Sequence, residues 1–199
     1  MEIKNIEKSY INAVVEVHKN SFNDFFLTRL GDDFLKVYYE SLRNNNNALL
    51  IGLFSGGKLC GFCAASVLSK GFNTQLIKNN FLQFSLIGIR LLFTRPYSFV
   101  RLIKNFSKIN SNIEDNAEYA ELVSIGVSKN DQGKGIGKKL LFELEKELKL
   151  KGCSKLSLTT DYYSNENTIG FYKRSGYEIY YEFIAYPDRK MYRMIKILN

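Results

Sequence analysis

The chain has 199 residues, enough to enclose one hydrophobic core, and its 45% hydrophobic and 24% charged residues are typical of a folded globular domain. Three cysteines provide no disulfide framework, and no stretch approaches the ~20 consecutive apolar residues that a membrane span needs. The N-terminus does not resemble a signal peptide, so we expect one cytoplasmic domain over residues 1–199.

The formal net charge of +8 is distributed unevenly along the sequence. No Asp or Glu lies between Glu40 and Glu114, whereas basic residues occur throughout that interval. The excess positive charge therefore belongs to a middle segment, and an anionic partner has to be considered. A nucleic-acid-coating protein would more often spread a basic stripe over its folded surface, so we expect no nucleic-acid partner.

The N-terminal third predicts a strand, two helices and a hairpin. A short strand at residues 1–6 precedes a helix with an apolar stripe from about Glu7 to Phe25. A second helix is expected from about Asp32 to Leu42. The apolar runs ALLIGLF and LCGFCAASVL flank the glycine turn SGGK, which predicts a β-hairpin.

Residues 69–116 predict a helical insertion of two or three helices. FLQFSLIGIRLLF (81–93) is apolar on most sides and predicts a nearly buried helix, whereas SFVRLIKNF (98–106) predicts an amphipathic, basic one. Three interpretations of the insertion stay open: a site for an anionic small molecule such as a nucleotide-linked amino sugar, a peripheral membrane contact, and a homodimer interface.

The C-terminal half alternates strands and helices. The expected order is a strand at 119–127, a glycine loop, a helix to about Leu150, a strand at 155–160, a short helix at 165–174, and two final strands joined by PDR.

The glycine loop DQGKGIGKKL (131–140) combines features that favour a phosphorylated ligand. A helix start leaves about four amide groups without partners and carries roughly half a positive charge, so Lys134, Lys138 and Lys139 are repelled there unless an anion is present. Glycines let a phosphate approach the backbone. The spacing matches neither the P-loop nor the dinucleotide fingerprint.

Two motifs resemble those of a known family. Val127 to Gly137, V-x-x-x-x-Q-G-x-G-I-G, is similar to the signature loop of the GNAT superfamily of acyl-CoA-dependent N-acyltransferases, and a lysine replaces the proline that many relatives have two residues after the valine. The block NENTIGFYKRSGYE (165–178) resembles the family's Asn-x-x-Ala-x-x-Leu-Tyr-x-x-x-Gly-Phe, with Asn165, Tyr172 and Gly176 in the matching places.

The resemblance implies a fold and a co-substrate. The fold is α/β (α+β), with a mixed, mostly antiparallel central sheet of six to seven strands flanked by helices and the helical insertion between strands 3 and 4. Two strands should splay apart and take acetyl-CoA, without any metal. The implied binding residues are Ile125, Gly126 and Val127 for the pantetheine and acyl group, Gln132, Gly133, Lys134, Gly135, Ile136, Gly137 and Lys138 for the pyrophosphate, and Asn165.

The resemblance also implies N-acetyltransferase activity: direct attack of a primary amine on acetyl-CoA in a ternary complex. Tyr172 stands at the family's acid position, and Glu121 at a position where some relatives carry a catalytic glutamate, although others use water. Alternation along a strand predicts that Glu121 shares a face with Val123, Ile125 and Val127, where burial would raise the pKa of its carboxyl.

Some features are expected to have no catalytic role. The only histidine, His18, is far from the loop in sequence and is predicted to be a surface or packing residue. Cys60 and Cys63 have C-x-x-C spacing but no second ligand pair, which favours core cysteines over a zinc site. The alternatives to an enzyme are a non-catalytic acyl-CoA sensor on the same fold and a basic membrane- or nucleic-acid-binding module.

Overall fold

The computed structural model of the chain describes residues 1–23, 25–97, 100 and 115–198. Within these ranges the strands form one seven-stranded sheet in the order β1-β2-β3-β4-β5-β7-β6. Only β4 and β5 pair in parallel, and every other neighbouring pair is antiparallel. The strands are β1 Glu2–Asn5, β2 Ala48–Ser55, β3 Lys58–Ser66, β4 Ala120–Val127, β5 Lys155–Asp161, β6 Glu178–Ala185 and β7 Arg189–Ile197. This sheet confirms the predicted fold class.

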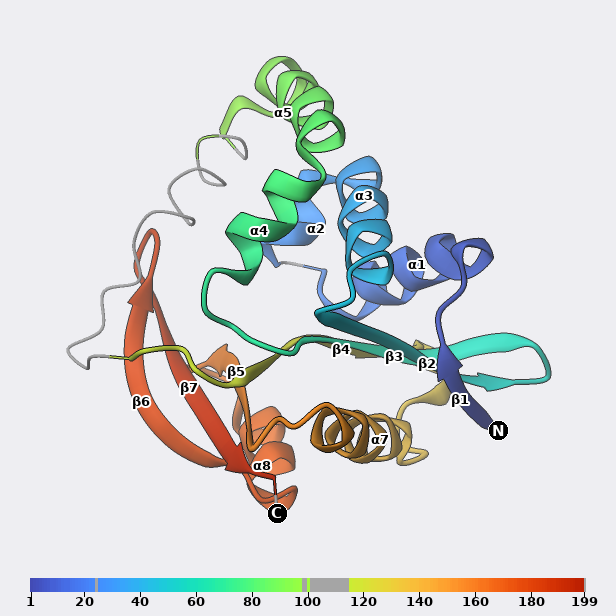
Figure 1. Ribbon diagram of the computed structural model, residues 1–199, viewed down its shortest axis with the longest axis vertical. Coiled ribbons are helices and arrows are strands. Elements are labelled where there is room, and N and C mark those ends of the chain that lie inside the picture. Colours follow the sequence, from blue (N-terminus) through green and yellow to red (C-terminus); the bar gives the residue numbers. More distant parts are fainter. Residues whose placement is uncertain (24, 98–99, 101–114, 199) are drawn as a thin grey trace.

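Helices cover both faces of the sheet (Figure 1). On one face lie α1 Ile11–Ser21, α2 Phe26–Leu30, α3 Asp32–Arg43, α4 Phe72–Asn79 and α5 Phe81–Thr94. On the other lie α7 Ile136–Leu150 and α8 Glu166–Arg174. Short 3-10 turns, η1 Lys8–Tyr10 and η2 Lys129–Asp131, precede α1 and follow β4. The first helix is shorter than its predicted range of about Glu7 to Phe25, and α2 was not predicted.

Each face of the sheet has its own hydrophobic core. One core joins α1 and α3 to inward-facing residues of β2 and β3, including Phe62 and Ala64. The other buries Leu140, Leu144 and Leu148 of α7 against the opposite face. The leucine spacing after the glycine loop puts these side chains on one stripe of the helix. This stripe packs on the sheet and so holds α7, with the loop that precedes it, against the strands.

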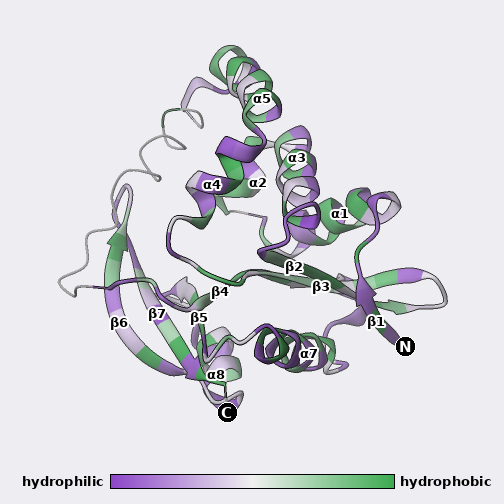
Figure 2. Ribbon diagram, viewed as in Figure 1, coloured by the Kyte–Doolittle hydropathy of each residue, from purple (hydrophilic) through white to green (hydrophobic). Residues whose placement is uncertain are grey.

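The insertion differs from its prediction in one respect. α4 and α5 lie between β3 and β4 as expected, but α5 is not nearly buried: Leu91 is buried, whereas much of the helix surface is apolar and exposed (Figure 2). The exposed apolar residues of α5 are Phe81, Leu82, Leu86, Ile89, Leu92 and Phe93. The reason is that, among the described elements, α5 packs chiefly on α3 and α4, which leave much of its surface uncovered.

The basic helix predicted at 98–106 lies outside the described residues, apart from Val100. Among the helices that the structure describes, none combines the length and apolarity required to cross a bilayer.

Candidate active site

The site is centred where β4 and β5 part. The two strands pair through Ala120, Glu121 and Leu122 only, although β4 continues to Val127 and β5 to Asp161. The separated ends leave a cleft of 990 Å³, which we call the acyl cleft. It is lined by Leu122–Val127 of β4, Leu158–Asp161 of β5, the C-terminal end of α1, the glycine loop and α8. This is the splayed arrangement that the family resemblance implied.

A β-bulge in β4 changes the predicted orientation of its side chains. β4 pairs Ser124 with Ala64 and Leu122 with Ala65 of β3, which leaves Val123 as an extra residue. Val123 packs on the α1 side of the sheet, whereas Ile125 and Val127 pack on the α7 side. The prediction that these residues all share one face with Glu121 is therefore wrong, because a bulge shifts the alternation by one position.

Gly126 marks a close approach between β4 and α1. A Cβ there would lie 3.0 Å from Ser21 Oγ and 3.1 Å from the Phe62 ring. The Ser21 hydroxyl donates a hydrogen bond to the carbonyl oxygen of Val127 at 3.3 Å. The end of α1 is thereby held against the end of β4, which places α1 in the wall of the acyl cleft.

The glycine loop turns directly into α7. Gly133 and Gly135 have φ of 78° and 74°, which glycine adopts without strain, and an added Cβ at either would meet nothing within 4 Å. Gly135 is the N-cap of α7, and no described side chain caps the helix. Among the described residues, the first amides of α7 therefore have no side-chain acceptor, as an anion site requires.

A second hollow of 500 Å³ continues the acyl cleft along this loop. The two share Val127, Gln132, Gly133, Gly137 and Phe171. Gly135, Ile136 and Lys138 line the hollow, and so does Arg174 of α8, which sequence analysis did not select. Arg174 is the last residue of α8, and basic residues in the last turn of a helix are common, so this position gave no functional signal in the sequence.

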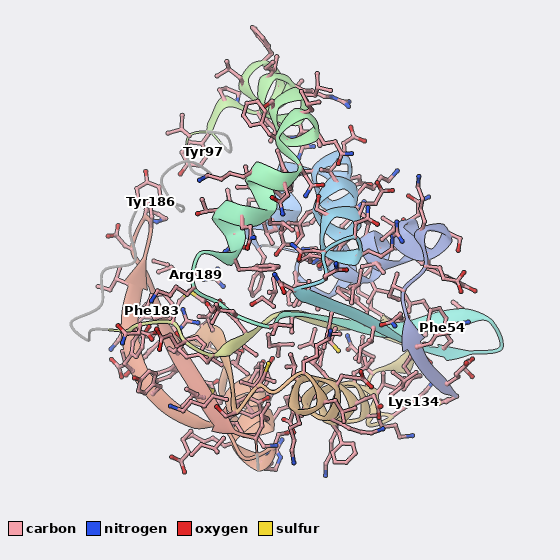
Figure 3. The ribbon with its side chains drawn as sticks, viewed as in Figure 1. Phe54, Tyr97, Lys134, Phe183, Tyr186 and Arg189 are labelled. Atoms are coloured by element: carbon pink, nitrogen blue, oxygen red, sulfur yellow. The ribbon has the colours of Figure 1, made fainter. Side chains whose placement is uncertain are left out.

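Lys134 and Lys138 of the loop differ in position. Lys138 lines the hollow. Lys134 is the one predicted pyrophosphate ligand that does not, but its ammonium pairs at 2.7 Å with Asp131, which does line the hollow, beside the start of α7 (Figure 3). The Lys134 side chain is exposed and that of Asp131 is partly buried, so the pair contributes little to stability.

Tyr172 and Asn165 enter the cleft from α8. Tyr172 is buried, and its ring makes edge-to-face contacts with Phe171 and Tyr177. Burial raises the pKa of its phenol well above the usual value, so the group keeps its proton and acts as a hydrogen-bond donor. Asn165 is the N-cap of α8, and its amide donates to Thr160 Oγ1 at 2.6 Å and to the Asp161 carbonyl at 3.0 Å. Asn165 thus ties the start of α8 to the end of β5.

Glu121 lies apart from Tyr172, in the wall of a different cavity. Its Oε1 accepts a hydrogen bond from Arg193 Nη1 at 2.6 Å, and its Oε2 accepts one from the Ser69 hydroxyl. Arg193 is 5% exposed, so this pair anchors the carboxylate firmly.

His18 is the residue whose place was least evident from sequence. It is 3% exposed on α1 and lines the acyl cleft. Its Nδ1 is 2.6 Å from the Tyr39 hydroxyl, which in turn donates to Ser124 Oγ at 3.2 Å. Its Nε2 is buried without a hydrogen-bond partner among the described residues. Burial lowers the pKa of His18 to about 4, so the imidazole is neutral at pH 7.

The far wall of the cleft contains a charged pair that sequence analysis also missed. Arg189 of β7 forms an ion pair with Asp161, and its guanidinium lies 4.6 Å from the centre of the Phe25 ring (Figure 3). Both partners line the cleft. The pairing needs β5 and β7 to be neighbours in the sheet, which no local sequence signal specifies.

Cys60 and Cys63 are both buried and free, as expected for core cysteines. Desolvation raises the pKa of the Cys63 thiol, which keeps it protonated and unreactive.

Known structures share this architecture at low sequence identity. The ribosomal-protein-S18-alanine N-acetyltransferase from Escherichia coli is 16% identical with a TM-score of 0.64, over 100% of this chain and 94% of that one. An aminoglycoside 6'-acetyltransferase type Ii is 17% identical with a TM-score of 0.63, over 100% and 98%. A PaiA N-acetyltransferase from Thermoplasma acidophilum, solved with coenzyme A, is 17% identical with a TM-score of 0.55, over 98% of both chains.

Residues 12–177 match the acetyltransferase (GNAT) family, and this match covers most of the chain. Comparison with curated proteins gives no match. The chain belongs to the GNAT acetyltransferase family, and its sheet, parted strands and glycine loop are those expected for such a member.

Proposed function

We propose that the chain is an acetyl-CoA-dependent N-acetyltransferase that acetylates a primary amine by direct attack in a ternary complex. The observation that carries this proposal is the opening between β4 and β5 beside an uncapped, glycine-lined helix start. Family membership supports acetyl transfer in general. Structural neighbours named for a ribosomal-protein alanine and for aminoglycosides support an amine acceptor.

The chain offers suitable groups for acetyl-CoA. Beyond Leu122, β4 has no ladder partner on β5, so the backbone of Ile125–Val127 is available to pantetheine amides. The diphosphate would lie along Gln132–Lys138, where the amides of α7 and Lys138 offer positive charge. Arg174 adds a cation that can form two parallel hydrogen bonds to a phosphate.

The reaction requires one proton to leave nitrogen and one to reach sulfur. The amine nitrogen attacks the thioester carbonyl carbon, the carbon–sulfur bond breaks, and an amide and a free thiol result. Unpaired amides of β4 would stabilise the developing negative charge on the carbonyl oxygen. Tyr172 would donate a hydrogen bond to the leaving sulfur, and its proton would move only as the thiolate forms, because a raised pKa opposes earlier release.

Two groups are candidates to take the proton from the amine. Glu121 has an anchored carboxylate next to the β4 bulge. His18 lies in the cleft wall, and its Nε2 has no hydrogen-bond partner among the described residues. His18 is therefore a second candidate, with a water molecule between its Nε2 and the amine. A lowered pKa makes the His18 imidazole a weak base, which favours a role in positioning the water or the amine over proton abstraction.

The proposal is tested by thiol release from acetyl-CoA over a panel of primary amines, with Tyr172→Phe and Tyr180→Phe as a matched pair. Phenylalanine keeps the ring packing of Tyr172 and removes its proton, so kcat should fall by about 10²-fold or more while acetyl-CoA binding is retained. Tyr180 lies half-exposed on β6 and serves as the control. Normal turnover by Tyr172→Phe would remove the acid assignment, and acetyl-CoA binding without turnover of any amine would favour the non-catalytic sensor.

A further inference from the structure

A further cavity of 690 Å³, separate from the hollow along the glycine loop, adjoins the acyl cleft, and we call it the apolar cavity. It lies between α2, α3, α4 and α5 on one side and the start of β4 on the other. A cavity of this size accommodates a small organic ligand. Its apolar lining comprises Phe26, Leu27, Phe34, Tyr38, Phe72, Leu76, Ile77, Phe81, Phe84, Ile87, Ile89, Leu91, Leu92, Leu122 and Val123.

One charged side chain faces this apolar surface. Among the described residues that line the cavity, Glu121 is the only charged one. Its two oxygens each accept one hydrogen bond, from Arg193 and from Ser69, and an ionised carboxylate can accept about four. Glu121 can therefore still accept hydrogen bonds from an ammonium group. The ion pair with Arg193 already holds the Glu121 carboxylate in position.

The apolar cavity and the acyl cleft meet at the β4 bulge. Leu122, Val123 and Thr159 line both, together with Phe26 and Leu27. Glu121 directly precedes Leu122 of the shared wall, so the Glu121 end of a ligand that fills the apolar cavity lies at the border with the acyl cleft.

We propose that the acceptor is a small amine with an extended apolar tail, such as a long-chain alkylamine or an arylalkylamine. The tail occupies the apolar cavity and the amino group is received at Glu121 beside the acyl cleft. This inference rests on the proposed function and narrows its substrate class. A nucleotide-linked amino sugar fits poorly, since its phosphates would face a carboxylate and no described basic side chain of the cavity lining.

The first experiment compares n-alkylamines from ethylamine to decylamine, with spermidine as a polar amine. Each methylene buried from water should raise kcat/KM about fourfold until the cavity is filled. Calorimetric titration of octylamine and ethylamine without acetyl-CoA should show the same preference in Kd, together with the negative heat-capacity change of apolar burial.

Two exposed residues of α5 provide a matched pair of variants. Ile89 lines the apolar cavity and is 58% exposed, whereas Leu86 is 70% exposed and is absent from the lining. Both should tolerate a polar side chain. Ile89→Asp should lower kcat/KM for octylamine at least tenfold and leave ethylamine nearly unchanged, whereas Leu86→Asp should change neither.

The outcomes separate this inference from the proposed function. If acetyl-CoA binds and amines are acetylated without dependence on tail length, the inference is overturned and the function stands. If acetyl-CoA does not bind, the function fails, and octylamine calorimetry with the two α5 variants still decides whether the cavity takes an apolar amine. Equal Kd values for octylamine and ethylamine would overturn the inference in either case.

Discussion

At the residue scale, burial and partners distinguish side chains of the same type. Tyr172 contributes a protonated hydroxyl to the acyl cleft, whereas the Tyr39 hydroxyl is committed to His18 and Ser124. The sequence identified Tyr172 because a family motif surrounds it. It gave no reason to select His18, because the hydrogen-bond partner of His18 is Tyr39 of α3, which is distant in the chain.

His18 should make folding stability depend on pH. Its pKa is lowered to about 4 in the folded state from 6.5, so the unfolded chain binds more protons between these values and stability falls as the pH falls below about 6.5. Between pH 7.5 and 5.0 the loss from this group should be about 2 kcal/mol. Urea denaturation at both pH values measures it.

The control for this prediction is His18→Asn, which cannot titrate but keeps a hydrogen-bonding group for Tyr39. Subtracting its pH dependence from that of the wild type isolates the imidazole from the carboxylates that titrate in the same range. Parallel slopes for the two proteins would show that His18 is not held neutral.

At the scale of elements, α7 is positioned by a polar link as well as by its leucines. Glu145 is 9% exposed on α7. It accepts hydrogen bonds from the Tyr177 hydroxyl at 3.0 Å and from Lys196 Nζ of β7 at 2.6 Å. This link connects α7, the helix that follows the glycine loop, to β7, which pairs with β6 at one end of the sheet. Leucine periodicity predicted α7, but it could not show that Glu145 of this helix would pair with Lys196 of β7.

Glu145→Gln should destabilise the fold by about 2 kcal/mol, because the partly buried Lys196 ammonium loses its counter-ion and its charge-assisted hydrogen bond. Glu143→Gln is the matched control on the same helix. Its ion pair with Lys146 is largely exposed, so its loss should stay within about 0.5 kcal/mol. Equal unfolding midpoints in urea for the two variants would contradict the role assigned to Glu145.

At the scale of the whole molecule, acetyl-CoA should stabilise the fold because the site proposed for it exists only when β4, α7 and α8 are assembled. At 100 times its Kd a ligand adds about 2.7 kcal/mol, which for a chain of this length is a rise in Tm of about 5–10 °C. Differential scanning fluorimetry with and without acetyl-CoA measures this rise.

Two glycines with nearly the same backbone angles test where the ligand lies. Gly135 has φ of 74° at the start of α7, and Gly57 has φ of 75° in the hairpin between β2 and β3. Alanine at either should cost about 1 kcal/mol or more in backbone strain. Only Gly135→Ala should reduce the acetyl-CoA-induced rise in Tm, because its methyl group would enter the proposed diphosphate site. Equal rises in the two variants would place the ligand elsewhere.

The sequence by itself determined the order of the strands, the helices other than α2, the glycine loop and the start of α7, and a family resemblance identified Tyr172. The strands, helices and loop follow from local chemistry: apolar periodicity, glycines that permit positive φ and helix-end amides. Only the tertiary structure decided the β4 bulge, the exposure of α5, the partners of His18 and the apolar cavity beside Glu121. Each of these depends on which distant segments pack together, and residue spacing along one chain does not encode that pairing.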